Sequence, residues 1–384
     1  MKLLTRAAEG TEGGRWRAAL SWGMTLFAFS LPLSIVPAQI FGYGSVLLGL
    51  IVAIRRPGAA RALFRQPMAI PVAAFAAVAV LASAFGPRPA PALGKCERLL
   101  LLPLVWLAPW AGAPRLARAW LAGVALRGGY DLIRIPLSAA RGAEWFVLGN
   151  MRDPQFYMAA LLLTLAAPFL LPARRGAVGT GWALYAAGVA LHFKRGVWLA
   201  GLGAGAALAA LTRRRRLLLA GALALTLLAA WPPARARVAT LPSEWSRRGG
   251  RMTLWTKVAP ALIRQYPWGI GFRATRHEDF TRITKHVEPR LRHLHNNILQ
   301  ITVELGWIGL AAWLWWMASA IRALVRRRRT ARAAGDAESA ALALGVLVAV
   351  IGLLLNGMVE YNFGDGEIFM LFLLLFGLGT ARPG

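Results

Sequence analysis

Residues 232–295 form a basic segment whose side chains suggest a chemistry. The segment contains thirteen basic and four acidic residues, an excess of nine positive charges. Eleven of the thirteen are arginines, and the planar guanidinium suits bidentate contacts with phosphate better than an ammonium group does. We therefore expect the segment to bind a polyanion, for which phosphorylated lipids and lipid-linked diphosphates are suitable. The simpler interpretation is a long, solvated basic loop without a specific ligand.

A histidine, His295, ends this segment and directly precedes Asn296 and an apolar run. Histidine is suited to general base catalysis because imidazole exchanges a proton near neutral pH. We predict such a role for His295; the simpler interpretation is a hydrogen-bonded structural residue at the start of a helix. His293 lies two positions earlier. We expect its side chain to point elsewhere, which would make it an internal control.

The elements that position these residues are predicted to be membrane helices. Hydrophobic residues make up 57% of the chain, the mean hydropathy is +0.51, and apolar runs long enough to cross about 30 Å of hydrocarbon recur throughout. The fifth predicted span is the weakest, because Arg127, Asp131 and Arg134 interrupt it, and we expect it to be short, broken or partly interfacial. The sequence predicts an all-α integral membrane protein with about twelve spans, at 18–36, 39–54, 68–86, 98–113, 116–137, 155–172, 176–193, 196–212, 217–232, 296–321, 340–358 and 366–381.

Short basic loops give the predicted orientation. Arginine-rich loops follow the second, fourth, sixth, eighth and tenth spans, so all of them face one side, which the positive-inside rule assigns to the cytoplasm. Both termini are then cytoplasmic, and the first apolar run is a retained helix rather than a cleaved signal peptide. The predicted organisation is membrane helices one to nine in residues 1–231, an outer basic loop with helical parts in 232–295, and helices ten to twelve in 296–384.

The net charge of +29 does not indicate a nucleic-acid-binding protein. Roughly half of the basic residues are explained by the positive-inside rule, and no interleaving of aromatic and basic residues typical of nucleic-acid modules occurs. Cys96 is the only cysteine, and the chain has no CxxC, HExxH, P-loop or GxGxxG pattern. We therefore expect no metal, no cofactor and no nucleic-acid partner.

Acidic residues near the predicted outer face are the expected partners of the arginines. The loop between the last two spans contains Glu360, Asp365 and Glu367. We favour pairing with arginines, although one of these carboxylates could act as the base in place of His295. Glu304 lies inside span ten, where a carboxylate must be paired or functional, and we expect a structural partner for it.

Several short patterns resemble the signature of the O-antigen ligase superfamily, which also includes O-antigen polymerases and bacterial protein O-oligosaccharyltransferases. One is Arg251 with a tryptophan, Trp255, four residues later. The others in the same region are the Pro-Trp-Gly-Ile-Gly turn at 267–271, the pair His295-Asn296 followed by Leu299, and a Gly-x-x-Gly-Leu pattern at 306–310.

Further patterns lie in the preceding helices. The run Arg195-Gly-Val-Trp-Leu-Ala at the start of span eight is similar to the Ser-Arg-Gly-x-Trp-Leu of the family, with Lys194 in place of the serine. Residues 150–157 are also similar, although Asp153-Pro154 departs from the common Asn-x-Asn form. The resemblance covers most of the chain.

The resemblance implies a fold of the membrane glycosyltransferase C class and a place in the bacterial inner membrane. It implies transfer of O-antigen glycan from undecaprenyl diphosphate to a lipid A core sugar at the periplasmic face, with inversion and without metal or nucleotide sugar. Within the superfamily, a polymerase and a protein O-oligosaccharyltransferase are alternatives. From another class, an anionic-lipid transporter or flippase is an alternative that predicts charges along the middle of several helices.

The site residues follow from this implied reaction. Breaking a bond between sugar and diphosphate develops negative charge on the leaving group, which fixed guanidinium groups stabilise. We expect Arg195 and Arg251 to hold the diphosphate and His295 to deprotonate the acceptor hydroxyl. Membrane lipids are the expected surroundings. The further substrate contacts that we expect are Arg273, Arg276, Arg292, Trp255 and Asn296.

Overall fold

The computed structural model describes residues 11–55, 66, 68–142, 153–289 and 291–380. The described residues form helices and connecting loops without a strand, so the predicted all-α class is confirmed. The first half of the chain contains α2 (Thr11–Ser30), α3 (Ile35–Arg55), α5 (Ala69–Phe85), α6 (Pro89–Lys95), η1 (Cys96–Leu101), α7 (Leu104–Leu107), η2 (Ala108–Ala111), α8 (Ala113–Ala140), α10 (Gln155–Ala166) and η3 (Pro168–Leu170).

The second half contains another set of long helices with a group of short helices between them. The long ones are α11 (Arg175–Leu191), α12 (Arg195–Thr212), α13 (Arg215–Ala230), α19 (Asn297–Ala333), α20 (Ala337–Asn356) and α21 (Gly366–Thr380). The short ones are α14 (Pro232–Ala239), α15 (Leu241–Ser246), α16 (Arg251–Thr253), the π-helical turn η4 (Leu254–Val258), α17 (Ala259–Gln265), α18 (His277–Thr281) and the 3₁₀ turn η5 (Asn362–Gly364).

Four of the described helices, α3, α12, α19 and α20, are long and apolar enough to cross a membrane. The number rises to six if the bent pairs 89–140 and 215–245 each count as one span, and α5, α10, α11 and α21 are shorter apolar helices. Each of the twelve predicted spans overlaps one or more of the described helices, and residue 381 of the last span lies outside the described residues. The structure therefore has the character of a helical membrane protein, and the number of spans stays a prediction.

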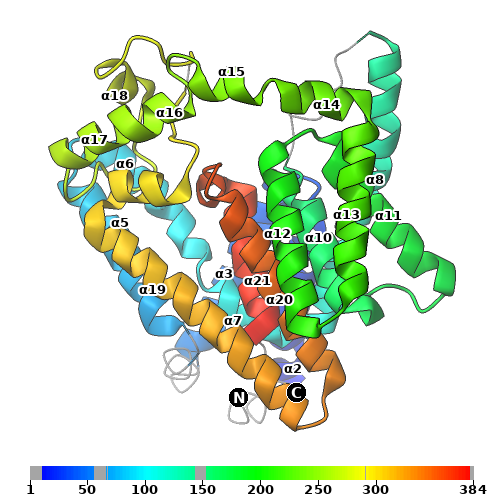
Figure 1. The fold of residues 1–384 in the computed structure, drawn as a ribbon. Coiled ribbons are helices and arrows are strands. Elements are labelled where there is room, and N and C mark those ends of the chain that lie inside the picture. Colours follow the sequence, from blue (N-terminus) through cyan, green and yellow to red (C-terminus); the bar gives the residue numbers. More distant parts are fainter. Residues whose placement is uncertain (1–10, 56–65, 67, 143–152, 290, 381–384) are drawn as a thin grey trace.

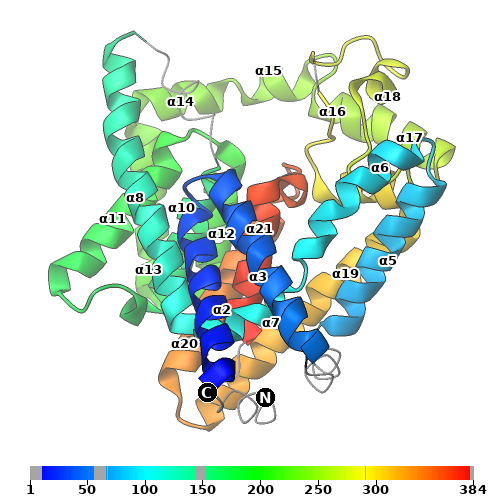
Figure 2. The same cartoon turned by 180° about the vertical axis from the view of Figure 1, so that it is seen from behind.

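The helices form a bundle with the short helices of the basic segment at one end. Figure 1 shows α14 to α18 along this end, and Figure 2 shows α2 beginning and α21 ending at the opposite end. Residues 251–265 are helical throughout, as α16, η4 and α17, in agreement with the helical parts expected in the basic segment. We call the end that carries α14–α18 the basic end of the bundle.

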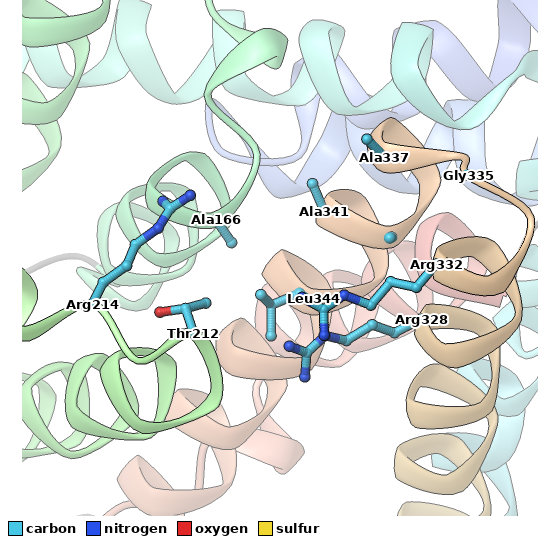
Figure 3. Close-up of a pocket in the computed structure, with 10 residues that line it drawn as sticks. Ala166, Thr212, Arg214, Arg328, Arg332, Gly335, Ala337, Ala341 and Leu344 are labelled. Atoms are coloured by element: carbon cyan, nitrogen blue, oxygen red, sulfur yellow. The ribbon is translucent and has the colours of Figure 1, made fainter.

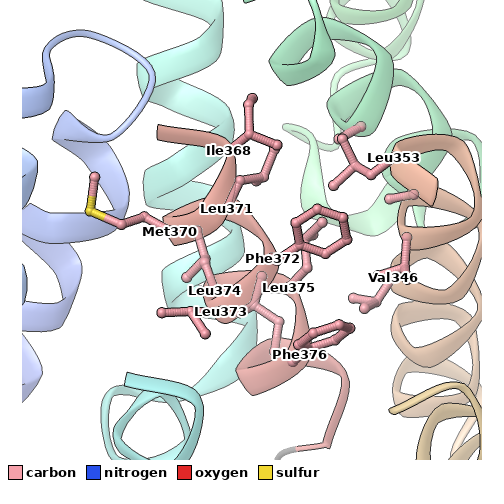
Figure 4. Close-up of a cluster of buried hydrophobic side chains, with 14 of the residues drawn as sticks. Val346, Leu353, Ile368, Met370, Leu371, Phe372, Leu373, Leu374, Leu375 and Phe376 are labelled. Carbon is pink, nitrogen blue, oxygen red and sulfur yellow. The ribbon is translucent and has the colours of Figure 1, made fainter. Parts of the chain in front are cut away.

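The centre of the bundle is the last helix, α21. All of its residues from Ile368 to Leu378 are buried, and Figure 4 shows their side chains reaching toward several neighbouring helices. A helix that is apolar on every side is stable only when it is surrounded. By contrast, α13 has no buried residue and exposes the apolar side chains of Leu219, Leu223 and Leu227. Such an exposed apolar face suits contact with lipid.

The expectation that the fifth span is short or broken is wrong, but α8 counts as a candidate span only together with the bent segment 89–111 before it, so a partly interfacial placement stays a prediction. The corresponding helix, α8, runs for 28 residues without a break, although it follows α6–η2 at an angle of 112°. Its charges satisfy one another, because Arg127 Nε lies 3.2 Å and Arg134 Nε 3.7 Å from the carboxylate of the buried Asp131. The hydroxyl of Tyr157 on α10 donates a hydrogen bond of 2.7 Å to the same carboxylate.

The Pro-Trp-Gly-Ile-Gly turn fixes the basic segment to α19. The backbone N–H groups of Ile270 and Gly271 donate to the carbonyls of Val303 and Glu304 at 3.0 and 2.8 Å. Opposite the turn, α19 is interrupted at Gly306, whose φ is +68°. A Cβ atom at Gly306 would lie 2.5 Å from the carbonyl oxygen of Pro267. Glycine is therefore needed here both for the left-handed conformation and for the close approach of the two backbones.

Candidate active site

Three of the charged side chains at the basic end meet in one group. Nδ1 of His295 lies 2.9 Å from Oε1 of Glu360, and the guanidinium of Arg251 lies 3.7 Å from Oε2 of the same carboxylate. His295 precedes α19, Arg251 begins α16, and Glu360 lies in the loop between α20 and α21. All three side chains are partly exposed, at 22%, 34% and 24%, so the group is accessible.

The backbone around His295 is held in an unusual conformation. His295 has a φ of +51°, a region that non-glycine residues seldom adopt and that is often found at functional sites. Asn296 then caps α19, because its Oδ1 accepts a hydrogen bond of 3.0 Å from the N–H of Leu299. Its Nδ2 donates to the carbonyl of Met358 at 2.8 Å. Both polar groups of Asn296 are therefore engaged in joining the start of α19 to the loop that carries Glu360.

The expectation that His293 points away from His295 is wrong. The two rings contact one another edge to face with their centroids 4.3 Å apart. His293 also lies near Tyr361, at 6.1 Å between the ring centroids. His293 therefore belongs to the same group, and it cannot serve as an independent control.

The surroundings of Glu360 and His293 shift the pKa values of both side chains. Burial alone would raise the pKa of Glu360, but its hydrogen bond with His295 and its electrostatic interactions with His295, His293 and Arg251 outweigh burial and lower the pKa to about 2. Burial lowers the pKa of His293 to about 4; electrostatic interactions with His295 and Arg251 contribute in the same direction, and Glu360 opposes them. At neutral pH Glu360 is therefore an anion and His293 is uncharged.

The second predicted diphosphate ligand, Arg195, is held by the outer helices of the basic segment. At the start of α12 its guanidinium donates to the carbonyl of Arg237 at 2.7 Å and to Oγ1 of Thr240 at 3.1 Å. It also forms an ion pair with Glu244 of α15, which Arg237 contacts as well. The carboxylate of Glu244 thus lies between two guanidinium groups, where an anionic ligand would be expected. The charge of Arg251 also acts on Arg195.

The other predicted ligands are Trp255, which positions its neighbours, and three arginines without an acidic partner among the described residues. Nε1 of Trp255 donates a hydrogen bond of 2.7 Å to the carbonyl of Leu294, which ties the helical turn after Arg251 to the residues before His295. Among the described residues, no carboxylate lies within salt-bridge distance of Arg273, Arg276 or Arg292. These three arginines remain able to contact an anion.

Glu304 has the structural partners that we expected, and all of them are neutral groups. Its carboxylate accepts hydrogen bonds from Gln300 Nε2 at 2.7 Å, Tyr361 OH at 2.8 Å and the backbone N–H of Arg273 at 2.9 Å, with Thr275 Oγ1 at 3.3 Å. This buried carboxylate therefore links α19, the loop after α20 and the basic segment. Glu304 thereby helps to hold in place the three segments that carry the candidate site.

The loop between α20 and α21 contains a second titratable carboxyl group. Burial, together with the negative charges of Asp153 and Glu360, raises the pKa of Asp365 to about 7. Because the folded protein then binds a proton more tightly than the unfolded chain, wild-type stability declines as pH rises toward about 7 and stays reduced above it. The ionised form of Asp365 is the destabilising one.

We therefore expect Asp365→Asn to raise the melting temperature more at pH 8 than at pH 5, because asparagine removes a charge that the wild type carries mainly at the higher pH. Thermal unfolding of the purified protein at the two pH values measures this difference. An equal change at both pH values would contradict the assigned titration.

The group around His295 also has a geometry that a metal ion could use. The ligand atoms of His293, His295 and Glu360 lie within 4.8 Å of one another, and two imidazoles with a carboxylate form a known zinc-binding set. However, Arg251 contacts the same carboxylate at 3.7 Å, and its positive charge would oppose a bound cation. The arrangement fits a hydrogen-bonded base better than it fits a metal centre.

These features define a helical membrane protein with an accessible cationic site at one end. Residues 180–314 match the family model described as O-Antigen ligase, which spans most of α11, the basic segment and the first part of α19. The match supports membership of the O-antigen ligase superfamily and thus confirms the resemblance predicted from the motifs. Arg195, Arg251 and His295 all lie inside the matched region, whereas Glu360 lies outside it. No curated protein matches the chain in sequence.

The sequence patterns indicated Glu360 only as one of three acidic residues and did not indicate Glu244 or His293 as members of the candidate site. Glu360 is 65 positions from His295, and Glu244 is 49 positions from Arg195. The excess of arginine in the segment indicated that acidic partners were needed. Nothing in the spacing of the residues indicated which carboxylates they were.

Proposed function

We propose that the protein is an O-antigen ligase that moves a glycan from undecaprenyl diphosphate to a lipid A core sugar at the periplasmic face. The observation that carries the proposal is the contact of His295 with Glu360 and of Glu360 with Arg251 at the basic end of the bundle. The glycosyltransferase-like character follows from the family. The donor, the acceptor and the inversion at the anomeric carbon are parts of the proposal.

The proposed step uses His295 as the base. With Nδ1 of His295 bonded to the anionic Glu360, the N–H lies on Nδ1 and Nε2 is free to accept a proton. The acceptor hydroxyl attacks the anomeric carbon, its proton passes to Nε2, and the bond between the anomeric carbon and the diphosphate oxygen breaks. Attack from the side opposite the leaving group inverts the anomeric carbon.

The arginines stabilise the charge that develops on the leaving diphosphate. Arg251 contacts Glu360, the partner of the proposed base, and Arg195 interacts electrostatically with Arg251. Glu244 bridges Arg195 and Arg237, so a bound diphosphate would take over the contacts of this carboxylate. Arg273, Arg276 and Arg292 are the proposed further contacts of the donor.

We propose no metal and no other cofactor for this reaction. The two guanidinium groups supply the positive charge that a divalent cation supplies in many other phosphate-dependent transferases. Chelation therefore separates this scheme from a metal centre built on His293, His295 and Glu360. Transfer should survive EDTA, whereas loss of transfer in EDTA and recovery with zinc would favour the metal centre.

The proposed topology has twelve spans, both ends of the chain in the cytoplasm and the basic end in the periplasm. Reporter fusions should give a cytoplasmic signal at Arg214 and Arg328 and a periplasmic signal at Gly249 and Asp365, because the first pair lies among the basic residues at the opposite end of the bundle. A cytoplasmic signal at Gly249 would contradict the proposed reaction, since the site would then face the wrong compartment.

Lipopolysaccharide profiles of a deletion strain distinguish the proposed ligase from its relatives. Loss of a ligase should leave short core lipopolysaccharide and accumulated lipid-linked polymer. Caps of one repeat would indicate a polymerase, and normal lipopolysaccharide would indicate a protein O-oligosaccharyltransferase. A transporter or flippase for anionic lipids would need charges available within the helices, whereas the buried Asp131 and Glu304 are engaged by neighbouring side chains.

A further inference from the structure

A second cationic site lies at the end of the bundle opposite the basic end. A pocket with a volume of about 350 Å³ is formed where α10 and α12 end, α13 and α20 begin, and α19 ends (Figure 3). Three arginines line it, Arg214 before α13 and Arg328 and Arg332 on the last turns of α19. Figure 3 shows Arg214 on one side and the other two arginines on the other.

The charges of this pocket lack a counter-ion within the described parts of the chain. No carboxylate lines the pocket, and neither Arg214 nor Arg332 has a carboxylate within salt-bridge distance there. The guanidinium of Arg328 donates only to a backbone carbonyl, that of Leu211, at 3.0 Å. Arg328 and Arg332 are also one turn apart on the same helix, a spacing at which like charges destabilise one another. An anion bound between them would relieve this repulsion.

The remaining lining of the pocket is apolar. Ala166, Ala340, Ala341 and Leu344 form the wall beside the arginines. The two helices that supply most of the lining, α19 and α20, are both long and apolar enough to cross a membrane. If α19 and α20 cross the membrane as proposed, the pocket lies where these helices leave the hydrocarbon, with arginines beside an apolar wall.

We propose that this pocket binds the phosphate of an anionic phospholipid headgroup, with the acyl chains along the apolar wall. Guanidinium groups bind phosphate through paired hydrogen bonds, and basic pockets between membrane helices are suited to lipid headgroups. The volume lies within the range of about 300–1,000 Å³ that is usual for small-ligand sites. The site is distinct from the glycan-transfer site and does not depend on the proposed function.

The test uses the full-length protein in a neutral detergent, with phosphatidylglycerol or phosphatidylcholine added at equal concentration. Phosphatidylglycerol should raise the melting temperature by on the order of 3 °C more than phosphatidylcholine, because a ligand that binds the folded state stabilises it. Arg332→Gln and Arg214→Gln should each remove at least half of this difference. Arg326→Gln is the matched control, because Arg326 is exposed on α19 and does not line the pocket.

Two outcomes would overturn the assignment. Equal stabilisation by both lipids, or equal losses in the control and the pocket variants, would show general surface attraction rather than a site. Stabilisation by inorganic phosphate alone that matches phosphatidylglycerol and is lost in the same variants would overturn the lipid source. Because all of the readouts are binding readouts on the purified protein, they are unaffected by the fate of the glycan-transfer proposal.

Discussion

His295→Ala is expected to lower glycan transfer at least about a hundredfold, because the acceptor hydroxyl loses the group that takes its proton. Glu360→Gln should also lower transfer strongly, since the amide no longer stabilises the imidazolium that forms during the step and can favour the wrong imidazole tautomer. Initial rates of the purified variants with a lipid-linked glycan donor measure both effects. Donor binding should persist in both variants, because the arginines hold the diphosphate.

The matched control is His286→Ala, an exposed histidine in the same basic segment, which should transfer at the wild-type rate. His293 is unsuitable because its ring contacts His295. Full activity of His295→Ala would remove the base from the scheme and direct attention to Asp365 and Glu367. A loss of donor binding in His295→Ala equal to its loss of transfer would instead indicate a distorted start of α19.

Arg195→Lys and Arg251→Lys are expected to lower transfer by about tenfold to a thousandfold while the protein still inserts and purifies normally. Lysine keeps the positive charge but loses the paired hydrogen bonds to the diphosphate, and removal of a donor to a developing negative charge has effects of this order. The effect should fall on the rate at saturating donor more than on the apparent affinity, because the charge increases as the bond breaks. Full kinetic curves on the purified variants provide both quantities.

Arg235→Lys is the control for this pair, because Arg235 belongs to the same basic segment, is exposed and is not among the proposed donor contacts. Its rate should equal that of the wild type. If Arg195→Lys and Arg251→Lys also transfer normally, the guanidinium groups act only as general positive charges that attract the donor to the membrane surface.

The long helices and the turn at 267–271 could be predicted because each depends on local sequence. Apolar runs indicated the positions of the long helices. The Pro-Trp-Gly-Ile-Gly pattern indicated a turn, and in the structure this turn packs against α19 at Gly306. One local expectation, that the fifth span is short or broken, was wrong for a reason that is not local. The charges in α8 did not break it because Asp131 is shared with both arginines and with Tyr157 from α10.

The arrangement around His295 could not be predicted from spacing alone. Residues that are two apart in an extended chain share a face, but the positive φ of His295 makes the local path irregular. The spacing therefore does not predict the contact between the rings of His293 and His295. Likewise the pairing of Glu360 with His295 requires the loop after α20 to reach the start of α19. Hydrogen bonds from Asn296 and Asn297 to that loop hold the two segments together.

Transfer by the purified full-length protein decides whether the group at the basic end moves a glycan from a lipid diphosphate. The reaction contains undecaprenyl diphosphate-linked O-antigen, lipid A core acceptor and EDTA, without nucleotide sugar. We expect glycan-bearing lipid A core with the wild type and at least about a hundredfold less with His295→Ala. A wild-type protein that binds the donor but forms no product, or forms it only after a metal ion is added, would contradict the account.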